Sequence, residues 1–311
     1  MLWIQIIFGL VLLTVGAEAL IRGASALARR FGMSELLIGL TLVGFGTSSP
    51  ELVSSVGAAL AGSPGVAVGN VVGSNIANIL LILGLSALLA PIAVGAKGFR
   101  RDAIVMGGAT VLAIAVSMTG EFGRIAGFAF LAALFGYLAW AYVGERQAGA
   151  AQLQNDSQAP AAKIGPSLLI SFAGLGLLGV GAHLLVTGAI SAATALNVSE
   201  TLIGLTIVAL GTSLPELVTS VVASLRGKSD LALGNILGSN IYNILGILGA
   251  TALIHPVAAP VDIVRFDNWV MLAATAALIF FAITRNRIER WEGAVLAAGY
   301  FAYIGFLAVN A

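Results

Sequence analysis

Two glutamates lie in the middle of apolar segments and have nearly identical neighbours. Glu51 lies in GLTLVGFGTSSPELVSSV (residues 39–56), and Glu216 lies in GLTIVALGTSLPELVTSV (residues 204–221). A carboxylate at the centre of a bilayer costs at least about 2.5–3.5 kcal/mol, so such a residue is a functional candidate by default. The two carboxylates together carry two negative charges, which match one divalent cation or two monovalent cations or protons.

The residues that precede each glutamate add further oxygen atoms. Thr47 and Ser48 lie four and three residues before Glu51, so on a helix they share its face. Pro50 has no amide hydrogen and its ring clashes with the carbonyl of residue 46, so the helix must kink or unwind there and turn carbonyl groups toward a cavity. The alternative for each hydroxyl is a hydrogen bond to the carbonyl four residues earlier in its own helix. The second motif repeats every element, with Thr212, Ser213, Pro215 and Glu216.

A second pair of motifs, GNVVGSNIANI (69–79) and GNILGSNIYNI (234–244), carries polar stripes on apolar helices. Polar residues recur every four positions in each: Asn70, Ser74 and Asn78, then Asn235, Ser239 and Asn243. Asn75 and Asn240 are expected to hydrogen-bond between helices rather than to bind an ion. Carboxylate, hydroxyl, amide and carbonyl oxygens suit a hard cation such as Ca²⁺ or Na⁺, whereas the chain has no cysteine and two histidines for zinc or copper.

The composition places these motifs in a membrane. Of the 311 residues, 59% are apolar and 9% are charged, against about 25% charged in a soluble domain. The mean hydropathy is +1.02, and the net charge of +1 draws no polyanion. These values exclude a soluble enzyme, a nucleic-acid binder and a disordered chain, and they predict a polytopic membrane protein.

Ten segments are long and apolar enough to be transmembrane helices. They span approximately residues 3–28, 36–61, 66–90, 102–119, 124–144, 165–194, 200–225, 231–254, 268–284 and 290–309. With both termini outside, the inside loops hold twelve of the 15 Lys and Arg residues and the outside loops hold two, with Arg22 in the first span. We therefore expect a multi-pass protein of the plasma (inner) membrane with extracellular or periplasmic termini. The N-terminal apolar run is interpreted as a span and not as a cleaved signal.

The motifs recur at a constant offset of 165 residues, as Glu51 with Glu216 and Asn78 with Asn243 show. Each copy belongs to a half with five spans, and an odd number of spans makes equivalent helices enter the membrane from opposite sides. The sequence therefore predicts an all-α fold of two inverted five-helix repeats, residues 1–144 and 164–311, with a flexible cytoplasmic linker at 145–163. The other acidic residues mostly fall at span ends or in loops, where we expect water to solvate them. Glu18 and Arg22 are expected to neutralise each other, and His183 is expected to be a hydrogen-bonded structural residue.

At the two glutamate motifs and the two GSN motifs, the chain closely resembles the sodium/calcium exchangers of the cation/calcium antiporter superfamily, in particular the short prokaryotic members. The resemblance covers essentially the whole chain and implies ten spans, outside termini and a cytoplasmic linker. It also implies a set of ion ligands, of which Gly44 and Ala209 contribute carbonyls: Gly44, Thr47, Ser48, Glu51, Ser74, Asn78, Ala209, Thr212, Ser213, Glu216, Ser239 and Asn243. Some relatives, including potassium-dependent exchangers, carry aspartate where this sequence has Asn243, so the neutral amide argues against potassium dependence and leaves Na⁺ or H⁺ as the counter-ion.

The resemblance implies alternating access, in which the first and sixth spans slide across the rest of the molecule. The expected function is therefore antiport of Ca²⁺ against Na⁺, with no cofactor, no nucleic acid, and the lipid bilayer as the only environment that the sequence identifies. The first alternative is a Ca²⁺/H⁺ antiporter that uses the same two glutamates. A passive cation channel would need no counter-ion gradient, and an intramembrane hydrolase lacks a base, because no histidine accompanies Ser48 in the motif.

Overall fold

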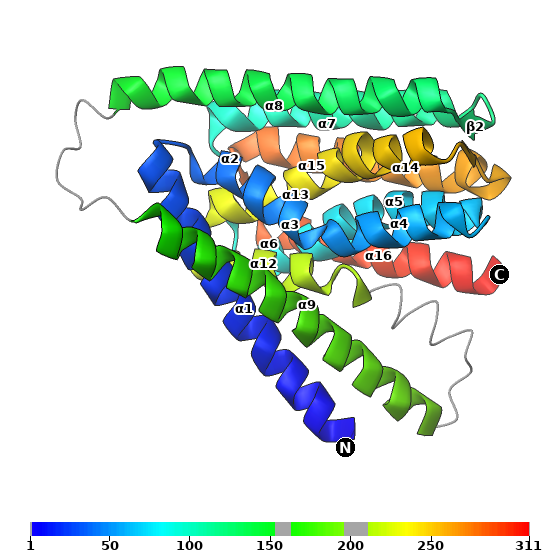
Figure 1. Cartoon of the computed structure of the whole chain (residues 1–311), viewed down its shortest axis with the longest axis horizontal. Coiled ribbons are helices and arrows are strands. Elements are labelled where there is room, and N and C mark those ends of the chain that lie inside the picture. The colour runs from blue at the N-terminus through cyan, green and yellow to red at the C-terminus, as the bar shows by residue number, and fades with distance from the viewer. Residues whose placement is uncertain (1, 153–162, 196–210, 311) are drawn as a thin grey trace.

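The structure is a computed structural model that describes residues 2–152, 163–195 and 211–310. These residues form helices almost throughout, with four strands of two residues each (Figure 1). The label η marks a short π-helical stretch. In chain order the elements are α1 (Leu2–Phe31), α2 (Glu35–Ile38), η1 (Gly39–Val43), α3 (Gly44–Thr47), α4 (Ser49–Leu60), α5 (Pro64–Ala77), η2 (Asn78–Leu83), α6 (Gly84–Leu89), β1 (Ile92–Ala93), α7 (Ala96–Ser117), β2 (Glu121–Phe122), α8 (Arg124–Gln152), α9 (Ile164–Ala195), α12 (Leu214–Leu225), α13 (Ser229–Ile241), η4 (Tyr242–Leu248), α14 (Gly249–Ile254), β3 (Val257–Ala258), η5 (Ile263–Asp267), α15 (Asn268–Arg285), β4 (Arg287–Ile288) and α16 (Arg290–Asn310).

Within the described residues, seven helices are long and apolar enough to cross a membrane, and an eighth span results if the bent pair 35–47 and 49–60 is counted as one. Two of the ten expected spans are not among them. The span expected at 102–119 corresponds to α7, which is long enough but carries Arg100, Arg101 and Asp102 near its start. The span expected at 200–225 is described only from residue 211 onward, where α12 begins at Leu214.

One boundary differs clearly from that expected. Helix α8 continues to Gln152, into the segment that the sequence predicts to be a linker. This extension has a simple cause, because Ala, Gln, Glu and Arg are good helix formers even where the segment is polar. The remainder of that segment, residues 153–162, lies outside the described residues.

The predicted break at the first glutamate motif is present. The helices on either side of Ser48 are bent by 45°, and Pro50 lies in the first turn of α4, where its missing amide hydrogen costs no hydrogen bond. Pro215 has the same place in α12. Each glutamate therefore lies in the first turn of a new helix, next to the break.

Helices α1 and α9 pack against each other along their length and are inclined to the other helices (Figure 1). Gly16 of α1 approaches the backbone of α9 so closely that a Cβ atom would lie 2.8 Å from Leu178 N and 2.9 Å from Gly174 O. Gly174 makes the reciprocal approach, with a Cβ atom 2.6 Å from Leu20 N and 2.8 Å from Gly16 O. The two long spans are thus held together backbone to backbone, and glycine is required at the contact.

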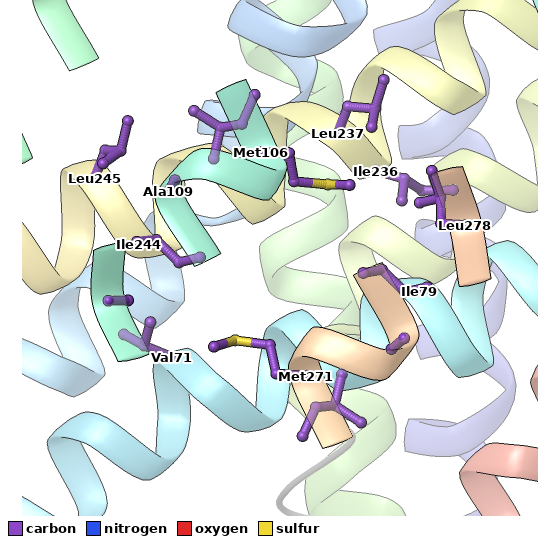
Figure 2. Packing of buried hydrophobic residues seen from close by; sticks show 14 of the residues in the cluster. Val71, Ile79, Met106, Ala109, Ile236, Leu237, Ile244, Leu245, Met271 and Leu278 are labelled. Carbon is purple, nitrogen blue, oxygen red and sulfur yellow. The ribbon is translucent and has the colours of Figure 1, made fainter. Parts of the chain in front are cut away.

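The core of the remaining helices lies between α5 with η2, α7, α13 with η4, and α15 (Figure 2). Met106 and Met271 are buried there, together with Ile79 and Ile244. Both pairs obey the 165-residue offset. The hydroxyls of Thr110 and Thr275, also separated by 165 residues, lie 3.5 Å apart where α7 contacts α15.

Two short antiparallel ribbons join the halves of the sequence. Strand β1 pairs with β4, so that Ile92 lies opposite Ile288, and β2 pairs with β3, so that Phe122 lies opposite Val257. All four side chains are buried. Each ribbon therefore takes one strand from each half.

Candidate functional site

The two glutamates lie close together, each linked to the other motif. Glu51 and Glu216 are 1% and 2% exposed. Ser48 Oγ donates a hydrogen bond of 2.8 Å to Glu216 Oε1, and Ser213 Oγ donates one of 3.4 Å to Glu51 Oε1. Each serine therefore supports the carboxylate of the other copy and not the one three residues ahead of it.

The second oxygen of each carboxylate is buried without a partner. Among the residues that the structure describes, Glu51 Oε2 and Glu216 Oε2 accept no hydrogen bond, and neither do Asn78 Oδ1 and Asn243 Oδ1. A buried polar atom without a partner costs about 1–3 kcal/mol, and more if the group is charged. A bound cation would supply the missing partner for these two carboxylate oxygens and two amide oxygens.

Thr47, Gly44 and Ser239 form a connected group beside the break. Thr47 Oγ1 donates to Val43 O at 3.0 Å, which is the hydrogen bond to its own helix that we gave as the alternative to ion binding. Its oxygen retains a free lone pair, so the two roles are compatible. Ser239 Oγ donates to Gly44 O at 3.2 Å. A Cβ atom on Gly44 would lie 3.0 Å from Ser239 N, so the glycine allows α13 to approach this carbonyl.

Asn70 and Asn235 support the glutamate helices from the side. Asn70 Nδ2 donates to Glu51 O at 3.1 Å and to Ser55 Oγ at 2.8 Å. Asn235 Nδ2 donates to Glu216 O at 3.4 Å and to Ser220 Oγ at 2.8 Å. These amides satisfy backbone carbonyls in the first turns of α4 and α12 and fix the two helices against α5 and α13.

The remaining asparagines divide in a way that spacing did not predict. Asn243 Nδ2 donates to Asn75 Oδ1 at 3.3 Å, which confirms that Asn75 bonds between helices. Asn240 was expected to do the same and does not, because its Nδ2 donates to Ile236 O of its own helix at 2.7 Å. With its amide held by Asn75, Asn243 keeps its Oδ1 free.

Of the other residues in the expected ligand set, two line a cavity and one lies outside the described residues. Ser74 and Thr212 line a cavity of about 440 Å³, and Ser213 lines it as well. Ser74 and Ser213 are 6% and 5% exposed, whereas Val66 in the same wall is 58% exposed. The cavity therefore extends from an exposed part of its wall to Ser213, the serine that donates to Glu51. Ala209 lies outside the described residues.

The expectation that acidic residues at span ends are solvated is wrong for Asp102. Its side chain is 0% exposed, accepts a hydrogen bond of 2.8 Å from Tyr137 Oη, and lies 2.6 Å from Arg101 Nε. Asp267 similarly accepts a hydrogen bond of 2.9 Å from Tyr303 Oη. The 165-residue offset between the two aspartates was visible in the sequence and could have identified this second polar pair.

Glu18 and Arg22 form the expected ion pair at 2.8 Å, and Glu18 Oε2 also lies 3.1 Å from Arg226 Nε. The second contact joins α1 to the end of α12 and was not predicted. His183 is exposed and makes no hydrogen bond with any described residue, in contrast to the structural role expected for it.

Across the described part of the chain, no group of three or more His, Asp or Glu side chains could hold a metal ion, so any cation at the glutamate site relies on neutral oxygens for the rest of its ligands.

Comparisons with known proteins agree with this chemistry. A model of the sodium/calcium exchanger protein family matches residues 1–143 and 166–309. The chain is 34% identical over 346 residues to the sodium/calcium exchanger MaX1 of Methanosarcina acetivorans, covering 96% of each protein. It is 36% identical over 313 residues to the inner membrane protein YrbG of Escherichia coli, covering 97% of this chain and 95% of that protein.

The fold is similar to solved structures of the sodium-calcium exchanger NCX_Mj. With a crystal soaked in 2.5 mM Na⁺ and 0.1 mM Ca²⁺, the TM-score is 0.82 at 34% identity, covering 97% of this chain and 96% of that chain. With a crystal soaked without Na⁺ and Ca²⁺, the TM-score is 0.84 at 35% identity, covering 97% of each chain. The similarity therefore extends over nearly the whole of that chain. By its motifs, its sequence and its fold, this chain is a multi-pass membrane protein that belongs to the sodium/calcium exchanger family of antiporters.

Proposed function

We propose that this chain is a secondary active antiporter that exchanges Ca²⁺ for Na⁺ by alternating access at the site between Glu51 and Glu216. The observation that carries the proposal is the reciprocal pair of serine–glutamate hydrogen bonds, which buries two carboxylates together and leaves one oxygen of each without a partner. A single Ca²⁺ or two Na⁺ ions neutralise the two charges.

Charge compensation couples the two ions. Closing the site empty would bury two unpaired carboxylates, and breaking a buried charge pair costs about 3–5 kcal/mol. The cavity therefore closes only over a loaded site, and each crossing carries either Ca²⁺ or Na⁺. An exchanger results because the empty protein does not cross between the two states.

The proposed ligands are oxygens of both halves. Glu51 and Glu216 contribute charge, and the amide oxygens of Asn78 and Asn243 are likewise buried without a partner among the described residues. The serines and threonines add neutral oxygens, and the Gly44 and Ala209 carbonyls complete the set. In full, the set is Gly44, Thr47, Ser48, Glu51, Ser74, Asn78, Ala209, Thr212, Ser213, Glu216, Ser239 and Asn243.

We also propose the ten-span arrangement of two inverted halves, residues 1–144 and 164–311, around a cytoplasmic linker at 145–163. Reciprocal contacts support it. The Ser48–Glu216 bond becomes the Ser213–Glu51 bond when each number is shifted by 165. The contact between Thr110 and Thr275 joins two equivalent residues, as expected where a twofold axis crosses a pair of helices.

The proposed location is the plasma (inner) membrane, with both termini extracellular or periplasmic. The asymmetry of Lys and Arg between loops supports this orientation. The names of two relatives support the location and the ions: an inner membrane protein in one case and a sodium/calcium exchanger in the other.

The proposal is tested in proteoliposomes loaded with Na⁺ and diluted into sodium-free buffer with ⁴⁵Ca²⁺. We expect Ca²⁺ uptake driven by the outward Na⁺ gradient, with no uptake when Na⁺ is absent and a pH gradient alone is imposed. Uptake driven by the pH gradient alone would instead establish the Ca²⁺/H⁺ antiporter. Uptake with neither gradient would indicate a passive channel.

Glu51→Gln and Glu216→Gln variants are expected to lose exchange completely, because each amide removes half of the compensating charge while it keeps the side chain's shape. The matched control is Glu121→Gln, an exposed glutamate of β2 outside the site, which should exchange at the rate of the unmodified protein. All three should elute as folded monodisperse protein in detergent. Exchange by either site variant at the unmodified rate would rule out this site.

A further inference from the structure

A carboxylate in the wall of the cavity distinguishes the two halves of the molecule. Asp267 and Tyr303 both line the cavity that leads to Ser74 and Ser213. Tyr303 Oη donates to Asp267 Oδ1 at 2.9 Å. A second oxygen, Oδ2, remains on a side chain that is only partly buried.

The equivalent aspartate in the first half has its charge cancelled. Asp102 lies 165 residues before Asp267, is 0% exposed, and is hydrogen-bonded by Tyr137 Oη at 2.8 Å. Arg101 Nε lies 2.6 Å from it and supplies the opposite charge. The aspartate–tyrosine pair is thus present in both halves, but in the first half it is neutralised and closed to water.

No equivalent of that arginine accompanies Asp267. The position 165 residues after Arg101 is Phe266, whose ring packs against Phe306 with centroids 4.5 Å apart. Arg265 is the nearest cation in the sequence, yet Asp267 makes no ion pair with any residue in the described part of the chain. Asp262 is a second acidic residue near Asp267 and adds to the negative potential there.

We propose that Asp267, oriented by Tyr303, is a docking site for cations at the outer part of the cavity, from which they pass to the Glu51–Glu216 site. A negative charge in a cleft with apolar walls raises the local concentration of cations and their rate of association. The wall around Asp267 is apolar, with Ile263, Ile304 and Leu307. Val66 and Ile263 in the cavity wall adjoin the segments near residues 62–65 and 255–262, which the loop charges assign to the extracellular or periplasmic side, so the proposed site acts on cations arriving from that side.

The expected effect of Asp267 on transport rests on the proposed exchange function. The attraction of cations into the cavity by its charge can be measured without transport. The chain has no cysteine, so Ser54→Cys introduces a single thiol into the cavity wall with little change in shape. In intact cells, we compare the rates at which a cationic and an anionic membrane-impermeant methanethiosulfonate reagent modify this thiol. Adding Asp267→Asn should lower the cationic-to-anionic rate ratio by about tenfold at low ionic strength, the lower end of the range for charge-lined clefts. The effect should diminish in 1 M choline chloride, where the screening length is about 3 Å.

Three control variants separate charge from structure. Tyr303→Phe removes the hydrogen bond to Asp267 Oδ1 but keeps the charge, and Asp267→Glu keeps the charge on a longer side chain, so both should retain most of the ratio. Asp262→Asn removes one charge from an exposed position that does not line the cavity, and it should have the smaller effect. A ratio unchanged by Asp267→Asn, or changed equally by Asp262→Asn, would overturn the proposal.

The transport consequence is a change in apparent affinity and not in maximal rate. With Ca²⁺ supplied from the cavity side at low ionic strength, Asp267→Asn should raise the concentration for half-maximal exchange by about tenfold, in proportion to the lost local enrichment. Ca²⁺ supplied from the other side should show no change, because those ions do not enter through the cavity that Asp267 lines. Loss of exchange at saturating Ca²⁺ would contradict a docking role. If the unmodified protein shows no exchange at all, the proposed function fails, whereas the thiol-reactivity ratio still tests Asp267.

Discussion

At the scale of single residues, the site is organised by how its polar atoms are satisfied. Every amide hydrogen-bond donor named above has a partner: Asn70 and Asn235 bond to backbone carbonyls and serines, and Asn243 bonds to Asn75. The atoms left over are acceptors, namely carboxylate and amide oxygens. A buried group of acceptors with their donors already committed attracts a cation and repels an anion, which is the charge selectivity that the proposed exchange requires.

In the proposed ligand set, Asn243 contributes a neutral amide oxygen, so its replacement by aspartate changes the total charge of the set. Asn243→Asp would add a third carboxylate beside Glu51 and Glu216, while one oxygen could still lie where Oδ1 lies now. We expect this variant to retain ion binding but to shift its relative preference between Ca²⁺ and Na⁺, because the charge count of the ligands sets cation affinity. The measurement is the ratio of half-saturating Ca²⁺ and Na⁺ concentrations in the proteoliposome assay.

Asn240→Asp is the matched control for Asn243→Asp. It introduces the same charge one helical turn away, at a residue whose Nδ2 is hydrogen-bonded within its own helix. A preference unchanged in Asn243→Asp, or changed as much in Asn240→Asp, would remove Asn243 from the ligand set.

At the scale of elements, the two longest helices, α1 and α9, pack tightly against each other. The contact of α1 with α9 is made by glycines at intervals of seven residues, Gly9, Gly16 and Gly23 on α1 and Gly174, Gly181 and Gly188 on α9. Such an interval keeps the glycines on one face of each helix. A seam of this kind lets two helices move as one body against the others, which is the role that the family resemblance implies for them.

Gly16→Ala tests this seam. The added Cβ atom would lie 2.8 Å from Leu178 N, so the helices must separate, and overpacking of this kind typically costs about 1–3 kcal/mol. We expect a lower midpoint temperature in detergent, followed by the loss of monodisperse protein on size exclusion after heating. Gly176→Ala on α9 is the control, since nothing lies within 4 Å of its added Cβ atom. There alanine should be neutral or stabilising by about 0.5–1 kcal/mol. Equal melting of the two variants would show that the close approach does not limit stability.

At the scale of the whole molecule, two of the contacts between the halves differ in how firmly they are held. Thr110 and Thr275 join α7 to α15 inside the core, and the two strand ribbons join the halves near the ends of the helices. In contrast, Glu18 joins α1 to Arg226 by an ion pair of 3.1 Å between partly exposed side chains. Exposed ion pairs contribute only about 0–1 kcal/mol, so this link can break and reform in the sliding motion that the family resemblance implies for α1 and α9.

Cross-linking distinguishes the moving contact from the static one. Because the chain has no cysteine, a Glu18→Cys/Arg226→Cys variant can be joined by a short bifunctional thiol reagent that a reductant cleaves. We expect the cross-link to block exchange by at least about tenfold and the reductant to restore it. A disulfide in Thr110→Cys/Thr275→Cys should leave exchange intact, because α7 and α15 stay together throughout the cycle. Undiminished exchange by the cross-linked Glu18→Cys/Arg226→Cys protein would contradict sliding of α1 against α12.

The sequence by itself determined the membrane class, the 165-residue repeat, the two glutamates and the break at Pro50. Each of these follows from local physics: an unpaired charge is too costly in an apolar segment, and proline cannot continue a helix without a kink. Only the tertiary structure decided that Ser48 bonds to Glu216 and not to Glu51, and that Asn75 and Asn240 have different partners. It also decided that Asp102 is buried beside Arg101 and Tyr137, whereas Asp267 faces a cavity. These choices depend on residues that lie up to 168 positions apart in the chain, and a hydrogen bond between them exists only once the helices have packed.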